Sequence, residues 1–173
     1  MDSLAAHKWI KLEEGNYRFL SQIERNFEED VNDALQMVVR DLRERVIDVA
    51  SDSLKNLKKY NHRKLRVFEV ALSIDEDEPK KKNDLNLKVY SPLWVSERDD
   101  PVQDAYYKSL GESDRIFWVS KNNLVFIDKV KRLLAVEKVF GEWSKRAKTP
   151  QELAELEPYR TEILNLKEEL PQL

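Results

Sequence analysis

A long stretch without helix breakers most constrains the fold of this chain, because neither glycine nor proline occurs between Gly15 and Pro79. Along it, from Leu20 to Leu57, the apolar residues recur mostly at intervals of three or four. This spacing predicts an amphipathic helix, with a period nearer to about 3.6 than to the 3.5 of a left-handed coiled coil. We therefore expect residues 16–60 to form one long helix or a helix pair.

The expected length of this helix is hard to reconcile with the size of the chain. An unbroken helix over residues 16–60 would be about 65 to 70 Å long, whereas a compact domain of 173 residues is roughly 40 Å across. The helix must therefore project onto a partner or break, and residues 51–53, Ser-Asp-Ser, offer caps for a new helix start. We predict an N-terminal helical region over residues 1–62 and a small α+β region over residues 63–173, folded as one cooperative unit.

The length mismatch leads us to favour a non-enzymatic interaction or scaffold function. In this interpretation the long amphipathic helix binds a protein partner or a second copy of the chain. The residues expected to form that interface share the apolar stripe of the helix: Ile23, Phe27, Val31, Leu35, Val38 and Leu42.

The apolar pattern changes to alternation beyond the first helical region. Residues 68–74 and 85–89 each alternate apolar with polar side chains and predict two half-buried strands, which we pair as an antiparallel hairpin. Residues 116–119 predict a third strand. Helical spacing over residues 126–143, a capping box at residues 149–152 and a helix opened by Pro158 predict the C-terminal helices. The fold class expected is α+β, predominantly helical.

The residue types needed for most catalytic and cofactor sites are scarce. The chain has no cysteine, two histidines without a nucleophile motif, and three isolated glycines that cannot form a phosphate-binding loop. Glu69, Asp75, Asp77 and Asp84 lie near one predicted hairpin and could bind magnesium, although such carboxylates usually just solvate a loop. We expect no enzymatic activity, no cofactor and no metal site.

A basic segment stands out in a chain of formal net charge −3. This segment suggests an alternative function, in which the chain is a nucleic-acid-binding accessory protein. Its cations would bind phosphates, and Tyr60 among them would stack on a base. The favoured interpretation is structural, because cations at the C-terminal end of a helix ending near Tyr60 suit the helix macrodipole. The residues of the nucleic-acid alternative are Lys55, Lys58, Lys59, Tyr60, Arg63, Lys64 and Arg66, with Lys80, Lys81 and Lys82 in the following loop.

Two further expectations concern location and small ligands. No run of residues approaches the roughly 18 apolar residues of a membrane span, so we expect no membrane association and a cytoplasmic protein. A weaker alternative function is a sensory domain, in which the hairpin and residues 116–119 form one wall of a small-molecule pocket.

Overall fold

The computed structural model describes residues 10–13, 15–37, 39–78 and 83–172. The chain divides into two compact units: unit 1 comprises Met1–Arg40 and Lys131–Glu168, and unit 2 comprises Asp41–Val130 and Glu169–Leu173. The boundary expected at residue 62 lies inside unit 2. The expected fold class is confirmed, since the described chain is α+β, mostly helical, and ends in helices.

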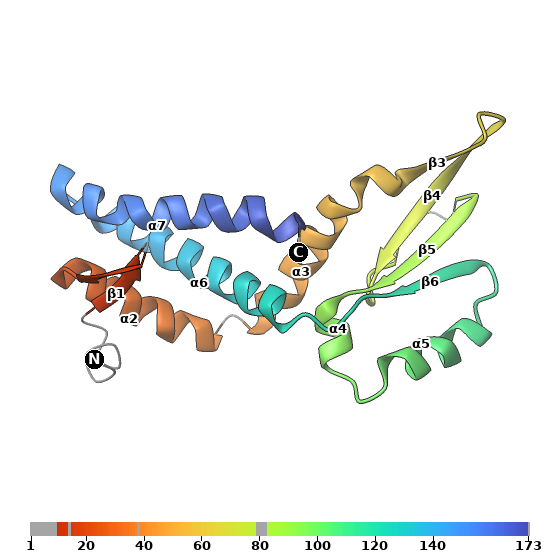
Figure 1. Cartoon of the computed structure of the whole chain (residues 1–173), viewed down its shortest axis with the longest axis horizontal. Helices are drawn as coiled ribbons and strands as arrows, with labels where there is room; N and C mark the ends of the chain where they lie inside the picture. The colour runs from red at the N-terminus through yellow and green to blue at the C-terminus, as the bar shows by residue number, and fades with distance from the viewer. Residues whose placement is uncertain (1–9, 14, 38, 79–82, 173) are drawn as a thin grey trace. The chain divides into compact units, whose positions relative to one another are not determined.

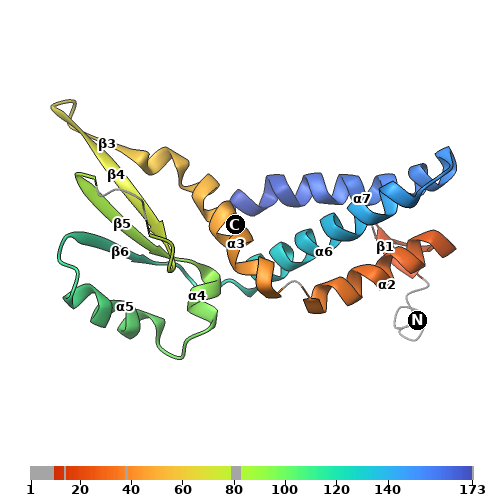
Figure 2. The same ribbon diagram turned by 180° about the vertical axis from the view of Figure 1, so that it is seen from behind.

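In unit 1 a small hairpin is combined with helices that lie side by side (Figures 1 and 2). Residues 16–19 form a strand, so the expectation of a helix from residue 16 is wrong. Gly15 explains the hairpin, because it joins the two antiparallel strands at a φ of 83°, which residues with a side chain rarely adopt. The elements are β1 (Ile10–Glu13), β2 (Asn16–Phe19), α2 (Gln22–Met37), most of α6 (Leu124–Arg146) and most of α7 (Pro150–Glu169).

A capping box begins α2. The Glu24 backbone N–H donates to Ser21 Oγ at 3.1 Å, and the Ser21 backbone N–H donates to the Glu24 carboxylate at 2.8 Å. This reciprocal pair satisfies two amides that a helix start otherwise leaves unpaired. The next helix, α3 (Val39–Ser53), begins only two residues after α2 ends. Residue 38, between these two helices, lies outside the described residues. The helical stretch ends at Ser53, within residues 51–53 where the sequence predicted a break, although a 3-10 helix rather than a new α-helix follows.

Aromatic side chains fill the interior of unit 1. Phe27 is completely buried, and its ring stacks on Tyr159 of α7 with ring centroids 3.9 Å apart. The ring of Trp143 in α6 meets Phe27 edge-on, at a centroid distance of 5.9 Å. Burial of large rings in such pairs contributes more stability than their area alone. The apolar stripe of α2 therefore packs against α6 and α7 of the same chain.

The start of α7 confirms the expected capping box, whereas its later course differs from the expectation. The Glu152 backbone N–H donates to Thr149 Oγ1 at 3.2 Å, and the Thr149 N–H donates to the Glu152 carboxylate at 3.1 Å. Pro158 lies inside α7 instead of opening a new helix. Proline removes one backbone hydrogen bond, and burial of Leu156 and Tyr159 on either side holds the helix together.

Unit 2 is built on a four-stranded sheet in the order β3-β4-β5-β6. β3 and β4 are antiparallel, and the other neighbouring strands are parallel. Besides α3, the elements are the 3-10 helix η1 (Lys55–Lys58), β3 (Lys59–His62), β4 (Arg66–Ile74), β5 (Leu85–Tyr90), α4 (Pro92–Ser96), α5 (Pro101–Leu110) and β6 (Arg115–Val119).

The predicted antiparallel pairing of residues 68–74 with residues 85–89 is wrong, because these two strands run parallel. Alternation identifies the two faces of a strand but carries no information on its direction. β4 ends at Ile74 and β5 begins at Leu85, opposite Val70, so ten residues connect these two strands, although parallel neighbours usually need a longer crossover. The third predicted strand, at residues 116–119, is confirmed as part of β6.

The helices α4 and α5 pack on one face of the sheet. Tyr90 and Trp94 are stacked there at a centroid distance of 3.8 Å, in a buried cluster with Val95 and Ala105. Phe117 and Val119 of β6 pack against this cluster. Side chains therefore fill this face of β6, whereas Ile116 and Trp118 of the same strand are exposed.

Candidate functional site

The basic segment forms a projecting arm, which we call the basic arm (residues 55–69): η1, β3, a turn and the first residues of β4. Only Val70–Ile74 of β4 pair with β5, so Arg66–Glu69 pair with β3 alone. Figure 1 shows the tip of this hairpin extending past the end of β5. The basic arm is therefore a two-stranded ribbon with solvent on both faces.

The cations of the basic arm are exposed and have few partners. Arg66 forms an ion pair with Asp84 at 3.4 Å. Among the described residues, no carboxylate pairs with the five others. Because unpaired cations repel one another, an anion from outside the chain would stabilise this arrangement. The five are Lys55, Lys58, Lys59, Arg63 and Lys64, and all are exposed.

The turn at the tip of the basic arm is conformationally strained. Arg63 has a φ of 50° and Lys64 a φ of 61°, and the Leu65 backbone N–H donates to the His62 carbonyl oxygen at 2.9 Å. Positive φ at both central residues is the type I′ turn, for which Asn-Gly is the preferred sequence. Each larger side chain costs about 1 to 2 kcal/mol in this conformation. Such strain indicates a requirement other than stability for these two cations.

The helix dipole does not account for the basic segment. The helix α3 ends at Ser53 and has no basic residue in its last turn, so the expected helix end near Tyr60 is wrong. Residues Lys59–His62 instead form β3, because their backbone pairs with Arg66–Glu69. Of the cations that the structural interpretation places at a helix terminus, Lys55 and Lys58 lie in the last turn of η1, whereas Lys59, Arg63, Lys64 and Arg66 lie in the hairpin, where no helix dipole acts on them.

One face of the basic arm carries aromatic rings. Tyr60 lies directly opposite Phe68, and His62 opposite Arg66. The Tyr60 ring centroid is 6.4 Å from that of Phe68 and 6.2 Å from that of His62. At the base of the arm is a groove of about 590 Å³, whose wall includes Lys55, Lys58 and Lys59 together with the carboxylates of Asp52 and Glu69. The lysines predicted at residues 80–82 lie outside the described residues.

The residues predicted as a partner interface are distributed over both units. Phe27 and Val31 are completely buried within unit 1, so the folded unit does not present them to a partner. Leu42 lies in unit 2 and is 5% exposed. Ile23 and Leu35 are half-buried, and Val38 lies outside the described residues.

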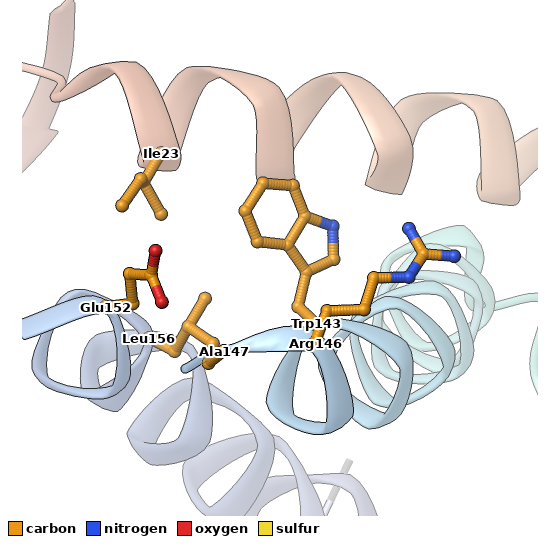
Figure 3. A pocket seen from close by; sticks show the side chains of 6 residues that line it. All are labelled: Ile23, Trp143, Arg146, Ala147, Glu152 and Leu156. Atoms are coloured by element: carbon orange, nitrogen blue, oxygen red, sulfur yellow. The ribbon is translucent and has the colours of Figure 1, made fainter. Parts of the chain in front are cut away.

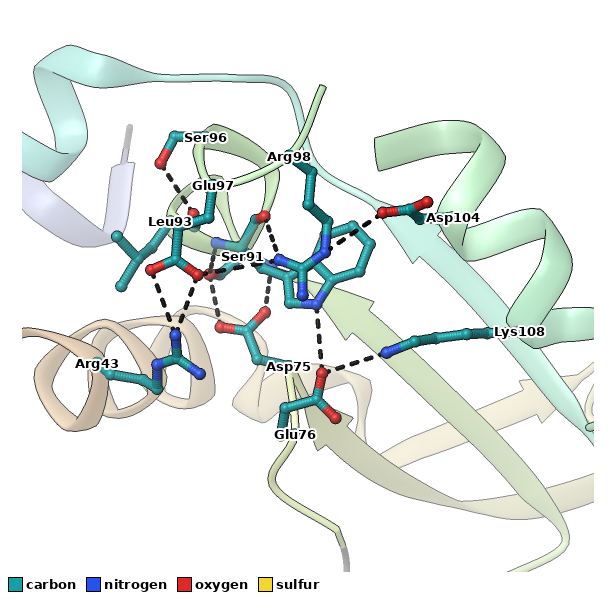
Figure 4. Close-up of polar contacts among 11 residues, drawn as sticks. Arg43, Asp75, Glu76, Ser91, Leu93, Ser96, Glu97, Arg98, Asp104 and Lys108 are labelled. Carbon is teal, nitrogen blue, oxygen red and sulfur yellow. Dashed lines mark hydrogen bonds and ion pairs between the residues drawn. The ribbon is translucent and has the colours of Figure 1, made fainter. Parts of the chain in front are cut away.

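A second polar cluster lies where β4 and β5 end (Figure 4). Asp75, with a φ of 52°, is 2% exposed. Its carboxylate accepts hydrogen bonds from the Ser91 backbone N–H and Oγ, both at 2.7 Å. Burial raises the pKa of Asp75 above its usual value, although the two Ser91 hydrogen bonds oppose the shift. Ser91 also caps α4, so this buried pair has a structural role.

The cations around this cluster are already paired. Lys108 lies 3.2 Å from the Glu76 carboxylate, and Arg98 stacks 3.7 Å over the Trp94 ring while it faces Asp104 at 3.6 Å. Burial of Tyr90 nearby raises its pKa to about 12. A site whose charges are mutually satisfied offers an incoming ligand few groups to bind.

Glu78 pairs with the buried ammonium of Lys88 at 2.6 Å, and with Arg115 at 2.8 Å. The Arg115 and Lys88 hydrogen bonds lower the pKa of Glu78 below its usual 4.5. A carboxylate of lowered pKa stabilises the fold above that value, and its contribution is lost as pH falls through the folded-state pKa.

We therefore expect Glu78→Gln to destabilise the protein at neutral pH by about 1 to 2 kcal/mol, because Lys88 loses its charged partner. The difference in melting temperature from the parent should shrink as the pH falls below about 4.5. Thermal unfolding of the parent and of Glu78→Gln over a pH series measures this difference in melting temperature. A difference independent of pH would contradict this role of Glu78.

A pocket in unit 1 is less promising as a site. It has a volume of about 230 Å³ and is lined by apolar side chains of α2, α6 and α7 with Arg146 and Glu152 (Figure 3). Hydrogen bonds from the backbone amides of Lys148 and Thr149 occupy the Glu152 carboxylate and lower its pKa. Arg146 lies 3.7 Å from Glu142. Both charged side chains of the described lining thus already have a partner within unit 1.

Comparison with known proteins adds no assignment, because no protein-family model, curated protein or solved structure matches the chain. Within residues 10–13, 15–37, 39–78 and 83–172, no cluster of three or more His, Cys, Asp or Glu side chains could hold a metal ion. No helix in this part of the chain has the length and apolar character needed to cross a membrane.

Proposed function

We propose that this protein binds nucleic acid through the basic arm. The observation that carries the proposal is the strained turn, in which Arg63 and Lys64 occupy positions that Asn-Gly would fill at lower cost. Together with Lys55, Lys58 and Lys59, these side chains form an exposed set of cations without ion-pair partners among the described residues.

The chemistry of binding follows from charge and shape. Lysine and arginine side chains neutralise backbone phosphates and release condensed counterions, so affinity falls steeply with salt concentration. The whole chain is acidic, with a formal net charge of −3. Attraction to nucleic acid must therefore come from local positive charge, which the basic arm supplies. We expect useful affinity at low salt and weak affinity at high salt.

Replacing the strained turn by its preferred sequence separates stability from function. We expect Arg63→Asn with Lys64→Gly to stabilise the hairpin by about 1 to 2 kcal/mol, because glycine removes the steric cost of positive φ at residue 64, whereas asparagine lowers it only in part at residue 63. The same variant should lose about tenfold or more in affinity for a labelled oligonucleotide, because two phosphate contacts disappear. Amide hydrogen exchange in β3 and β4 measures the first effect, and fluorescence anisotropy the second.

Lys121→Gln with Lys138→Gln is the matched control, since it also removes two exposed positive charges but leaves the basic arm intact. It should bind like the parent. A turn variant that is more stable and binds as tightly as the parent would contradict the proposal.

A further inference from the structure

Resting on the proposed function, we infer that the ligand of the basic arm is a single-stranded nucleic acid whose bases stack on Tyr60. The inference comes from the way β3 and β4 sort their side chains between the two faces of the ribbon. Directly opposite residues of an antiparallel pair project to the same face. Tyr60 and Phe68 therefore share one face with His62 and Arg66, whereas Lys59 and Glu69 lie on the other.

The Tyr60 ring is open to an incoming base. It is 52% exposed, and no hydrogen bond to its hydroxyl is found among the described residues. Phe68 supports the ring from the opposite strand at a centroid distance of 6.4 Å. An exposed ring set among cations is the combination with which proteins bind single strands, because every base offers a flat face for stacking.

The positions of the cations complement this face. Arg63 and Lys64 lie at the tip of the basic arm, and Lys58 lies at its base, next to Lys59 on the opposite face. The backbone rises by about 13 Å over the four steps of extended strand from residue 59 to residue 63. A strand lying along the ribbon could thus place phosphates at both ends and unstacked bases on the aromatic rings between them.

A duplex ligand fits the aromatic face less well. A two-stranded ribbon is narrow enough for the major groove of DNA, but paired bases present only their edges there. The side chain on this face best suited to a base edge, Arg66, is engaged with Asp84 at 3.4 Å and lies 4.6 Å over the Phe68 ring. Tyr60 would have no base to stack on, so the arrangement favours unpaired bases.

The test compares variants of Tyr60 against two labelled probes at the same salt concentration, a thymidine oligonucleotide and a self-complementary hairpin duplex. The parent should bind the single strand at least about tenfold more tightly. Tyr60→Ala should lose about 5- to 150-fold in affinity for the single strand, the usual effect of removing one stacked ring. The salt dependence of binding should be the same for Tyr60→Ala as for the parent, because the substitution removes no phosphate contact. A uridine oligonucleotide as third probe distinguishes RNA from DNA as the source of the strand.

Two matched variants keep the result interpretable. Tyr60→Phe retains the ring and should bind within about twofold of the parent. Tyr60→Leu retains the packing against Phe68 without a stacking surface, and should lose affinity as Tyr60→Ala does. If Tyr60→Ala and Tyr60→Leu bind the single strand like the parent, or if the parent prefers the duplex, the inference is overturned while the proposed function stands. If the parent binds none of the probes, the proposed function itself fails.

Discussion

Lys58→Glu combined with Arg63→Glu is expected to lower the affinity for a single-stranded oligonucleotide by at least about a hundredfold at low salt. Each substitution replaces an attractive contact by a repulsive one, at the base and at the tip of the basic arm. The plot of log affinity against log salt should become shallower by about 1.4, because each phosphate contact on a single strand contributes about 0.7 to the slope. Fluorescence anisotropy titrations over a salt series measure both quantities.

A control variant separates this local effect from the change in net charge. Lys121→Glu with Lys138→Glu shifts the charge by the same amount at exposed positions outside the basic arm. It should retain the affinity and the salt dependence of the parent. Equal losses in the two variants would mean that long-range charge, and not the basic arm, determines binding. No loss in Lys58→Glu with Arg63→Glu would exclude the basic arm as the site.

Arg132→Met should cause a large loss of stability in unit 1. The Arg132 guanidinium donates to Glu28 at 3.0 Å and to Glu162 at 2.7 Å, and thus links α2 to α7 from its position in α6. Burial alone would lower the pKa of Arg132. The hydrogen bonds to Glu162 and Glu28 outweigh this effect, so the pKa of Arg132 is raised. The substitution removes the cation that these two largely buried carboxylates share. We expect a loss of about 2 to 4 kcal/mol in the free energy of unfolding.

The triple variant Glu28→Gln, Arg132→Met, Glu162→Gln tests whether this loss arises from uncompensated charge. It should recover much of the stability, because replacing a whole buried ionic group by neutral side chains is often nearly neutral. Urea unfolding of the parent and both variants at neutral pH measures the differences. If the triple variant were no more stable than Arg132→Met, packing rather than charge would be the reason for the loss.

Local signals in the sequence predicted much of the helical structure. The Thr149–Glu152 capping box marks the start of α7. A local cap also begins α5, where the Asp100 carboxylate accepts a hydrogen bond from the Gln103 N–H three residues later. These features could be predicted because a cap depends on residues only three positions apart.

Features that depend on distant pairing could not be predicted in the same way. The backbone of Lys59–His62 is a strand only because Arg66–Glu69 returns beside it, through a turn that lacks the glycine usually used to recognise a hairpin. The parallel direction of β5 likewise depends on the path of residues 75–84. The absence of glycine and proline therefore predicts a helix as far as residue 60, and this prediction is wrong because the helix ends at Ser53.

The candidate site was partly visible in the sequence. Composition identified the cluster of cations and the presence of Tyr60 among them. It did not reveal that Tyr60 and Phe68 form one face, or that Arg63 and Lys64 occupy a strained turn, since both depend on the strand register. A sequence search that accepts basic residues at the two central positions of a type I′ turn could have predicted a hairpin here instead of a helix.

The most direct test of the central claim is a nuclear magnetic resonance titration of the ¹⁵N-labelled protein with an unlabelled thymidine oligonucleotide at low salt. Our account predicts that amide signals of residues 55–68 shift first and furthest. These shifts should reverse when salt is added. Shifts concentrated elsewhere in the chain, or no shifts at millimolar oligonucleotide, would contradict nucleic-acid binding by the basic arm.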